Sequence, residues 1–263
     1  MSEITMGLHI IVCIKSVTLQ PPDAKGVRSP ESFEMNPFDR PALEAGLRLR
    51  ETFGGKVTAL SMGPELFRNA LFEALAMGVD ESILVSDPAL AGSDTLATST
   101  ALAEAVKKLS PFDLLFFGTR AADSDTGHVG PQTAVVLDLP MVSGVTKIEK
   151  TDKGLLVERR IDDSLERYEI VLPAALTLHH RSTPARDAGL PGIQTAFEGK
   201  EVKTWSLKDL GLTPENVGEQ GSGTKVISLS RVKKERKCEF LSGSAEELAD
   251  ELIERLSDSG LIS

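Results

Sequence analysis

The chain has 263 residues, 41% of them hydrophobic, and a formal net charge of -10 with a pI near 5.0. This apolar content is enough to bury a substantial core, which excludes a disordered chain. The acidic balance lacks the excess of Lys and Arg that neutralises phosphates, so we expect no nucleic-acid partner.

The two cysteines and the apolar runs narrow the class of protein further. Cys13 and Cys238 have neither a CxxC spacing nor His ligands around them, which argues against a metal site and a disulfide framework. The apolar run before Lys15 is too short for a signal peptide. The longest apolar runs are far below the ~20 residues of a membrane span. We therefore expect a cytoplasmic protein without a membrane span.

The first half of the chain alternates strands with helices. The β-branched run at 8–14 predicts a buried parallel strand. After a long polar loop, "NPFDRPALEAGLRLRE" predicts a helix with Asn36 as N-cap and Pro37 at its first position. Three further strands, "KVTALSMG", "SILVSD" and "DLLFFG", are each followed by a predicted helix. Such alternation is typical of an α/β fold with an open, mostly parallel, doubly wound sheet.

The pattern changes after Pro140. Residues 142–178 alternate around two turn signals and predict an antiparallel β extension. Residues 179–201 have no clear periodicity and predict a long loop. The end of the chain predicts an arm and a helix, capped by Ser244 with Glu247 three residues later. We divide the chain into a nucleotide-binding domain at 1–212 and a C-terminal arm with helix at 213–263.

The stretch "GTRAADSDTGHVGPQ", Gly118–Gln132, lies between a buried strand and a helix. Its glycines allow close approach of a ligand, and the N–H groups at the helix start can bind an anion such as a phosphate. Asp123 or Asp125 can accept a hydrogen bond from a ribose hydroxyl. Spacing alone leaves a solvated turn equally open, because the stretch is neither a Walker A loop nor a GxGxxG fingerprint.

Other strand ends meet the same edge of a parallel sheet. Cys13, the NPFD stretch and Met62 would converge there around an adenine ring. Cys13 also fits the simpler role of a small buried hydrophobe. We find neither an acid/base pair nor an activated nucleophile, so we expect a binding protein and not an enzyme.

Several motifs together make the sequence recognisable. "VCIKSV", "NPFDRPALEAGLRLRE", "LAMGVDESILV", "GTRAADSDTGHVGPQTA", "VERRIDDSLERYEIVLPAALTL" and "LPGIQTAFEGKEV" occur in this order over residues 8–212. The chain in this respect resembles the β (small) subunit of electron-transfer flavoproteins, the family that includes the FixA proteins. The resemblance implies an adenine-nucleotide-hydrolase-like α/β domain in a heterodimer with an α subunit that carries FAD.

The resemblance also implies a cofactor site and a docking loop. The positions that match the family's nucleotide site are Cys13, Asn36, Pro37, Phe38, Asp39, Met62, Gly118, Thr119, Arg120, Ala121, Ala122, Asp123, Ser124, Asp125, Thr126, Gly127, His128 and Val129. Leu190, Pro191, Gly192 and Ile193 match the loop, at about 179–200, that docks acyl-CoA-dehydrogenase-type flavoenzymes.

Two questions stay open at this stage. The text "DSDTGHVGP" is more similar to the motif of electron-bifurcating members, which hold a second FAD in this subunit, than to that of members that hold AMP. The resemblance therefore favours FAD, with AMP as the alternative, and an NADH-dependent bifurcating activity if FAD is bound. A stand-alone adenine-nucleotide-binding module without a redox role is the competing class, which the antiparallel extension and the terminal arm argue against.

Overall fold

The fold is that of a computed structural model, which describes residues 7–18, 33–151, 154–225, 227–228 and 238–262. The chain divides into two compact units, Met1–Lys225 and Val226–Ser263. The strands are β1 (Leu8–Cys13), β2 (Ser16–Thr18), β3 (Phe33–Met35), β4 (Gly55–Met62), β5 (Glu81–Val85), β6 (Leu114–Gly118), β7 (Met141–Thr151), β8 (Gly154–Ile161), β9 (Ser164–Ile170), β10 (Ala174–Leu178) and β11 (Val202–Trp205). The α-helices are α1 (Arg40–Phe53), α2 (Arg68–Met77), α3 (Thr95–Lys108), α4 (Val129–Val136), α5 (Leu190–Gly199), α6 (Gly218–Gly221) and α7 (Ala245–Asp258).

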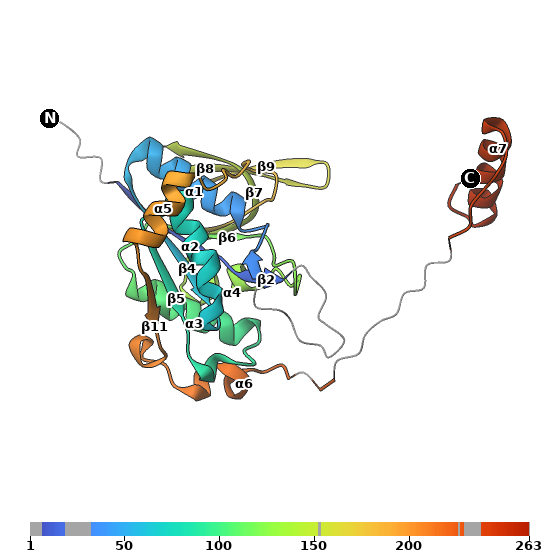
Figure 1. Cartoon of the computed structure of the whole chain (residues 1–263). Coiled ribbons are helices and arrows are strands. Elements are labelled where there is room, and N and C mark those ends of the chain that lie inside the picture. The colour runs from blue at the N-terminus through green and yellow to red at the C-terminus, as the bar shows by residue number, and fades with distance from the viewer. Residues whose placement is uncertain (1–6, 19–32, 152–153, 226, 229–237, 263) are drawn as a thin grey trace. The chain divides into compact units, whose positions relative to one another are not determined.

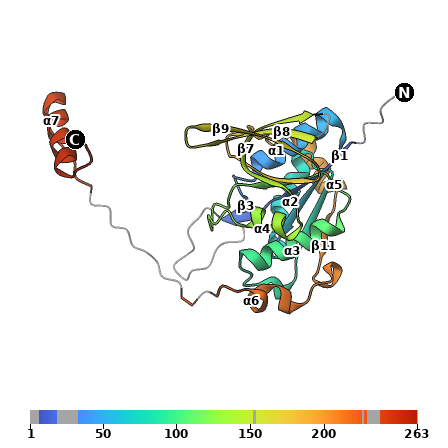
Figure 2. The same cartoon turned by 180° about the vertical axis from the view of Figure 1, so that it is seen from behind.

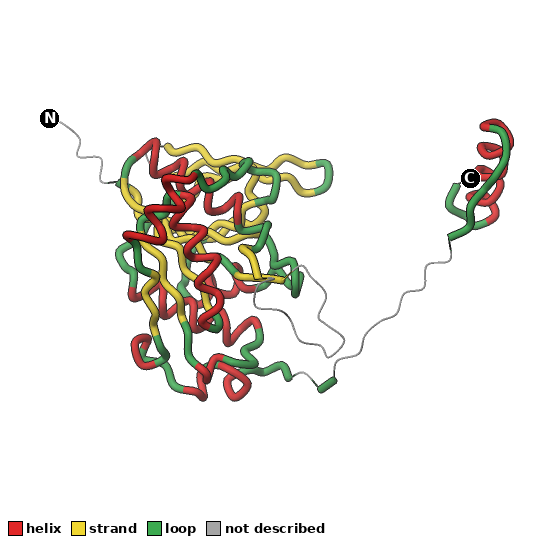
Figure 3. Tube along the Cα trace, viewed as in Figure 1, coloured by secondary structure: helices red, strands yellow, loops and turns green. Residues whose placement is uncertain are grey.

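A nine-stranded sheet organises the first unit, with the order β11-β5-β4-β1-β6-β10-β7-β8-β9. All ladders from β11 to β7 are parallel, whereas β7, β8 and β9 pair antiparallel. Figure 3 shows the long antiparallel hairpin reaching out beyond the helices. The predicted open, mostly parallel sheet with an antiparallel extension is thus confirmed.

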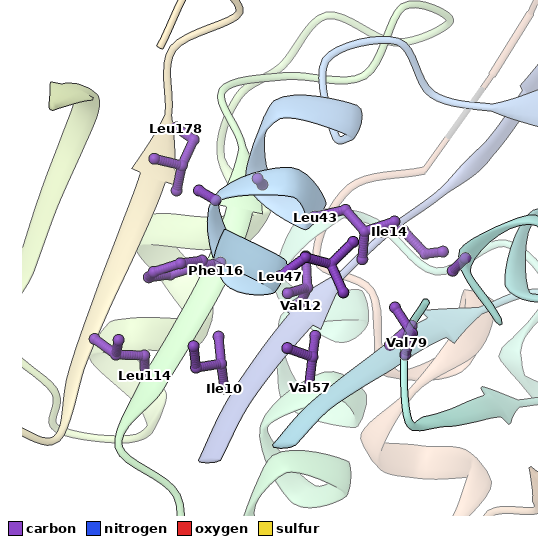
Figure 4. Close-up of a cluster of buried hydrophobic side chains, with 14 of the residues drawn as sticks. Ile10, Val12, Ile14, Leu43, Leu47, Val57, Val79, Leu114, Phe116 and Leu178 are labelled. Atoms are coloured by element: carbon purple, nitrogen blue, oxygen red, sulfur yellow. The ribbon is translucent and has the colours of Figure 1, made fainter. Parts of the chain in front are cut away.

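Helices cover both faces of the parallel strands. Helices α1, α2 and α5 pack over one face, and α3 and α4 over the other (Figures 1 and 2). On the first face, Leu47 of α1 lies over Val12 of β1, and Leu43 lies beside Ile14 (Figure 4). Every residue of β1 is buried, as expected of a central parallel strand that packs against helices on both sides.

The start of α1 differs from the prediction. Asp39 occupies the N-cap position and the helix begins at Arg40, three residues after the predicted first position, Pro37. The Asn36 side chain leaves the helix altogether and bonds to the loop after β6. Elsewhere, Asp94 caps α3 through the N–H of Ala97, and Gly78 ends α2 in a left-handed conformation.

The region after Pro140 corrects two predictions. The sequence places strand β10 in the antiparallel extension, but it pairs parallel with both β6 and β7. Its five residues are buried, as is typical of a strand within a parallel sheet. The predicted loop at about 179–200 contains the helix α5. Strand β11 follows at the sheet edge, pairing parallel with β5.

The first unit extends beyond the predicted boundary at residue 212. Residues 213–225 stay with it through hydrogen bonds to the loop before α3: Gly218 N–H to Ser93 Oγ, the Ser222 hydroxyl to Gly92 O, and Thr224 N–H to Asp94 Oδ2. The second unit holds α7, whose predicted capping box of Ser244 and Glu247 is present. The basic run at 231–237 lies outside the described residues. Among those described, no helix combines the length and apolarity that a membrane span requires.

Candidate functional site

The carboxyl ends of β1 and β6 form the centre of the candidate site. From β1 the chain moves to β4 on one side, and it later returns as β6 on the other side of β1. This is the switch point at which open α/β sheets bind ligands. The predicted site residues Cys13 and Gly118 end these two strands, so the sheet brings them to one edge as expected.

A clamp joins the segment before α1 to the loop after β6. Asn36 Nδ2 donates to Arg120 O at 2.8 Å, and Ala122 N–H donates to Asn36 Oδ1 at 3.2 Å. Asp39 accepts the N–H of Lys15 at 2.8 Å and the N–H of Gly118. Both side chains are buried, so these hydrogen bonds are shielded from water. The clamp fixes the first five residues of the loop to the end of β1.

The Asp39 carboxyl of the clamp has a strongly shifted pKa. Burial raises its pKa to about 7, even though hydrogen bonds from Lys15, Asn36 and Gly118 favour the ionised form. The nearby Cys13 thiol is buried too, and burial together with the Asp39 charge raises its pKa. A thiol held protonated in this way is neither a nucleophile nor a metal ligand.

The rest of the loop contains two residues with a left-handed backbone. Gly127 has a φ of 64° and Asp125 a φ of 54°, both in the left-handed region. A Cβ on Gly127 would lie 3.1 Å from Thr119 O, so a larger residue meets both strain and crowding. Helix α4 follows at Val129 without a side-chain cap, which leaves its first N–H groups for a ligand or water.

Two cationic side chains line the loop, and one of them was missed from the sequence. Lys15 pairs with Asp123 at 2.8 Å, and Arg120 pairs with Asp125 at 3.0 Å while lying 4.4 Å from the Phe38 ring centroid. Lys15 follows β1 directly, and that position at the end of a central strand was the available signal. Both basic side chains beside the loop are therefore paired with acids of the loop in this structure.

The remaining predicted residues occupy less uniform positions. Pro37, Ala122, Ser124, Thr126 and His128 are exposed, whereas Thr119, Ala121 and Val129 are half-buried. Cys13 and Met62 both pack into the apolar cluster on the α3 and α4 face. They can form an apolar wall for a ring but contribute no charge. The sheet thus brings the predicted residues to one edge, and their role as a nucleotide site stays a prediction.

The predicted docking residues lie at the start of α5. Leu190 is 82% exposed, and Phe197, two turns later, is 68% exposed. Phe197 stacks on Phe72 of α2 with ring centroids 5.1 Å apart. Gly192 meets α2 so closely that a Cβ would lie 2.2 Å from Ala76 O. Leu190 is thus presented on a helix held rigidly against α2.

Other parts of the described chain offer little competing chemistry. Its His, Cys, Asp and Glu residues form no group of three or more that could hold a metal ion. One hollow lies between α1, β7 and residues 182–183, and a second, apolar one lies between α3 and α4. Neither of these two hollows is lined by residues of the clamp.

Comparison with known proteins gives a consistent result. The family model described as "Electron transfer flavoprotein domain" matches residues 27–210. The chain is 40% identical to the electron transfer flavoprotein subunit beta of Thermoanaerobacterium thermosaccharolyticum, over 97% of this chain and 100% of the relative. It is 35% identical to the caffeyl-CoA reductase-Etf complex subunit CarD of Acetobacterium woodii, with the same coverage. It is 38% identical to the protein FixA of Azotobacter vinelandii, over 83% of this chain and 82% of the relative.

Proposed function

We propose how this chain, which belongs to the electron transfer flavoprotein family as a β subunit, takes part in electron transfer. Membership rests on a family match and on relatives aligned over nearly the whole chain. The chain is a subunit of an electron carrier and not an enzyme on its own, and it functions together with an α subunit. The proposal concerns its cofactor, its docking surface and its partners.

The edge formed by β1 and β6 holds an adenine nucleotide in this proposal. The observation that carries it is the clamp, in which Asn36 and Asp39 fix the loop from Gly118 to Ala122 ahead of the N-terminus of α4. The phosphates lie against Thr126–Val129, where Gly127 allows close approach. Lys15 and Arg120 lie beside the phosphates and share their charge with Asp123 and Asp125, one of which accepts a ribose hydroxyl.

FAD is the nucleotide that we favour in this subunit. The motif at Asp123–Pro131 is more similar to that of electron-bifurcating members than to that of members with AMP. A bound flavin would supply the ability to accept and pass on electrons, whereas AMP would have a structural role alone. The residues of the chain bind and orient the nucleotide in either case.

Cofactor extraction from the heterodimer tests this choice. The chain is co-expressed with its α subunit, and flavin and AMP are released by heat and quantified. We expect about two flavins per heterodimer, one of them in this chain. About one flavin per heterodimer together with extractable AMP would show that this subunit binds AMP and not FAD. The absence of any adenine nucleotide beyond the flavin of the α subunit would overturn the site itself.

The partners follow from the surfaces that remain exposed. Leu190 on α5 docks an acyl-CoA-dehydrogenase-type flavoenzyme, as an exposed leucine on a rigid helix suits an interface anchor. One relative is named as a subunit of a caffeyl-CoA reductase complex, which supports a CoA-thioester flavoenzyme as partner. The C-terminal residues 213–263, with the amphipathic α7, contact the α subunit, and the complex functions in the cytoplasm.

A further inference from the structure

Asn36 has a buried side chain whose amide hydrogen bonds to other parts of the protein. It is 1% exposed and lies in the NPFD stretch before α1. Its amide donates to Arg120 O and accepts from Ala122 N–H. It also bonds to Asp39 of the same stretch. An asparagine amide has two donor hydrogens and an oxygen that can accept two hydrogen bonds, so three of these four possibilities are used within the protein.

These bonds do not serve the local helix. An N-cap asparagine accepts from the N–H groups two or three residues later, which would be in the first turn of α1. Asn36 instead reaches residues 84 and 86 positions away in the chain. Its two partners flank Ala121 in the loop that precedes α4. The side chain therefore determines the conformation of that loop.

The loop is held in the same way at its base. Asp39 accepts from Gly118 N–H, and Asp125 N–H donates to Ala121 O at 2.8 Å within the loop itself. Beyond these bonds, Ala122 and the four residues after it are exposed. An exposed loop without such anchors would have to be ordered by its ligand, at a cost in binding free energy.

We propose that Asn36 is a positioning residue, which preforms the nucleotide-binding loop through Arg120 and Ala122 and does not contact the nucleotide. This rests on the proposed nucleotide site. Asn36 belongs to the positions matched to that site, and its role here differs from one in which it contacts the adenine. The loop would then hold its binding conformation in the nucleotide-free chain.

The test combines binding with amide exchange in the full-length chain. AMP and FAD are titrated separately into nucleotide-free protein, and hydrogen exchange of the Ala122 amide is followed without ligand. In the wild type we expect a protected Ala122 amide. Asn36→Ala should bind the preferred nucleotide about tenfold to a hundredfold more weakly, as two hydrogen bonds order the loop, and should lose the Ala122 protection.

Two further variants keep the outcome interpretable. Ala122→Pro removes the backbone N–H that donates to Asn36 Oδ1. Because Ala122 is exposed, this change leaves the core untouched, and it should weaken nucleotide binding. Ser82→Ala removes another buried side-chain hydrogen bond, from Ser82 to Leu71 O, far along the chain from the loop. It should lower the unfolding midpoint without changing nucleotide affinity.

The possible results separate the inference from the proposed function. If the wild type binds neither AMP nor FAD, alone or with the α subunit, the nucleotide site itself fails. If the wild type binds and Asn36→Ala binds equally well, Asn36 does not position the loop. If the ligand-free wild type shows an unprotected Ala122 amide, the loop is not preformed, and the inference is wrong even when affinity falls.

Discussion

Gly118 lies directly against the carboxylate of Asp39. A Cβ built on Gly118 would be 2.3 Å from Asp39 Oδ1 and 2.5 Å from Phe38 O. Only a glycine lets the end of β6 come this close to the start of α1, and that approach allows the Gly118 N–H to reach the Asp39 side chain. The glycine is thus required for contact within the protein, before any ligand is considered.

Replacement of Gly118 by alanine should therefore damage both the fold and the site. The added methyl group forces β6 and the NPFD stretch apart, and we expect a loss of about 1–3 kcal/mol in the free energy of unfolding. Nucleotide affinity should fall as well, since the loop begins at this residue. Chemical denaturation and titration with AMP or FAD measure the two effects. Gly199→Ala is the control, because a Cβ there meets nothing within 4 Å. Equal stability of both variants would contradict the close approach.

The raised pKa of Asp39 predicts an unusual dependence of stability on pH. Burial raises the folded-state pKa to about 7, whereas an unfolded aspartate titrates near ~3.9. The folded chain therefore binds the extra proton between these values, so this contribution to stability is present at low pH and is lost as the pH rises from about 4 to about 7.

The Asp39→Asn variant isolates that contribution. Its amide cannot ionise, so the difference in unfolding free energy between wild type and variant should become less favourable to the wild type from pH 5 to pH 8. Asp94→Asn is the opposite control. Hydrogen bonding from Ala97 N–H lowers the pKa of Asp94, so its contribution is lost as the pH falls. Parallel curves for wild type and Asp39→Asn would contradict the raised pKa.

The sequence was a good guide wherever a local pattern determined the structure. The buried run of β1 was predicted, and the Asp94 cap of α3 and the glycine that ends α2 likewise depend on only a few neighbouring residues. Hydrophobic runs separated by helices were enough for the parallel sheet. The capping box of α7 was equally readable, because its two side chains bond reciprocally over three residues.

The misses involve partners that are distant along the chain. Asn36 reads as a local cap, but its partners lie more than eighty positions away. Lys15 faces Asp123 only once β1 and β6 are neighbours. The sequence "LPGIQTAFEG" has a glycine and a proline in its first turn and gives a weak helical pattern. Its helix is stabilised by packing on α2, which no local rule reveals.

Glu44 of α1 forms ion pairs that hold the segment leading to α5, and the stability of the chain should depend on them. It is 1% exposed and accepts from Arg48 and from Arg186 at 2.7 Å each. Burial alone would raise the pKa of Glu44, but the hydrogen bonds from the two arginines hold it below its usual range. Arg186 also pairs with Glu51, which ties residues 181–189 to α1.

Arg186→Ala should lower the free energy of unfolding by about 2 kcal/mol, because the buried Glu44 carboxylate keeps only the Arg48 side chain and the backbone N–H of residue 186 as partners. Thermal and chemical denaturation measure the loss. Adding Glu44→Gln to the variant should restore part of the stability, since the charge that lacks a partner is removed. Arg167→Ala, which breaks an exposed pair with Glu158, should change stability by less than about 1 kcal/mol. If Arg186→Ala lowered the free energy of unfolding as little as Arg167→Ala does, the Glu44 carboxylate would not depend on Arg186.

Leu190 carries the prediction for electron transfer. Its side chain is 82% exposed at the first turn of α5, and burying a leucine in a partner pocket contributes about 1.5–3 kcal/mol. Leu190→Ala should therefore raise the concentration of carrier needed for half-maximal reduction by the dehydrogenase about tenfold or more. The flavin content should stay unchanged, because α5 begins far along the chain from the loop at 118–128. Leu165→Ala, which truncates another exposed leucine on β9, is the matched control and should behave like the wild type. Normal reduction of the Leu190 variant, or a loss of flavin from it, would show that α5 is not the docking surface.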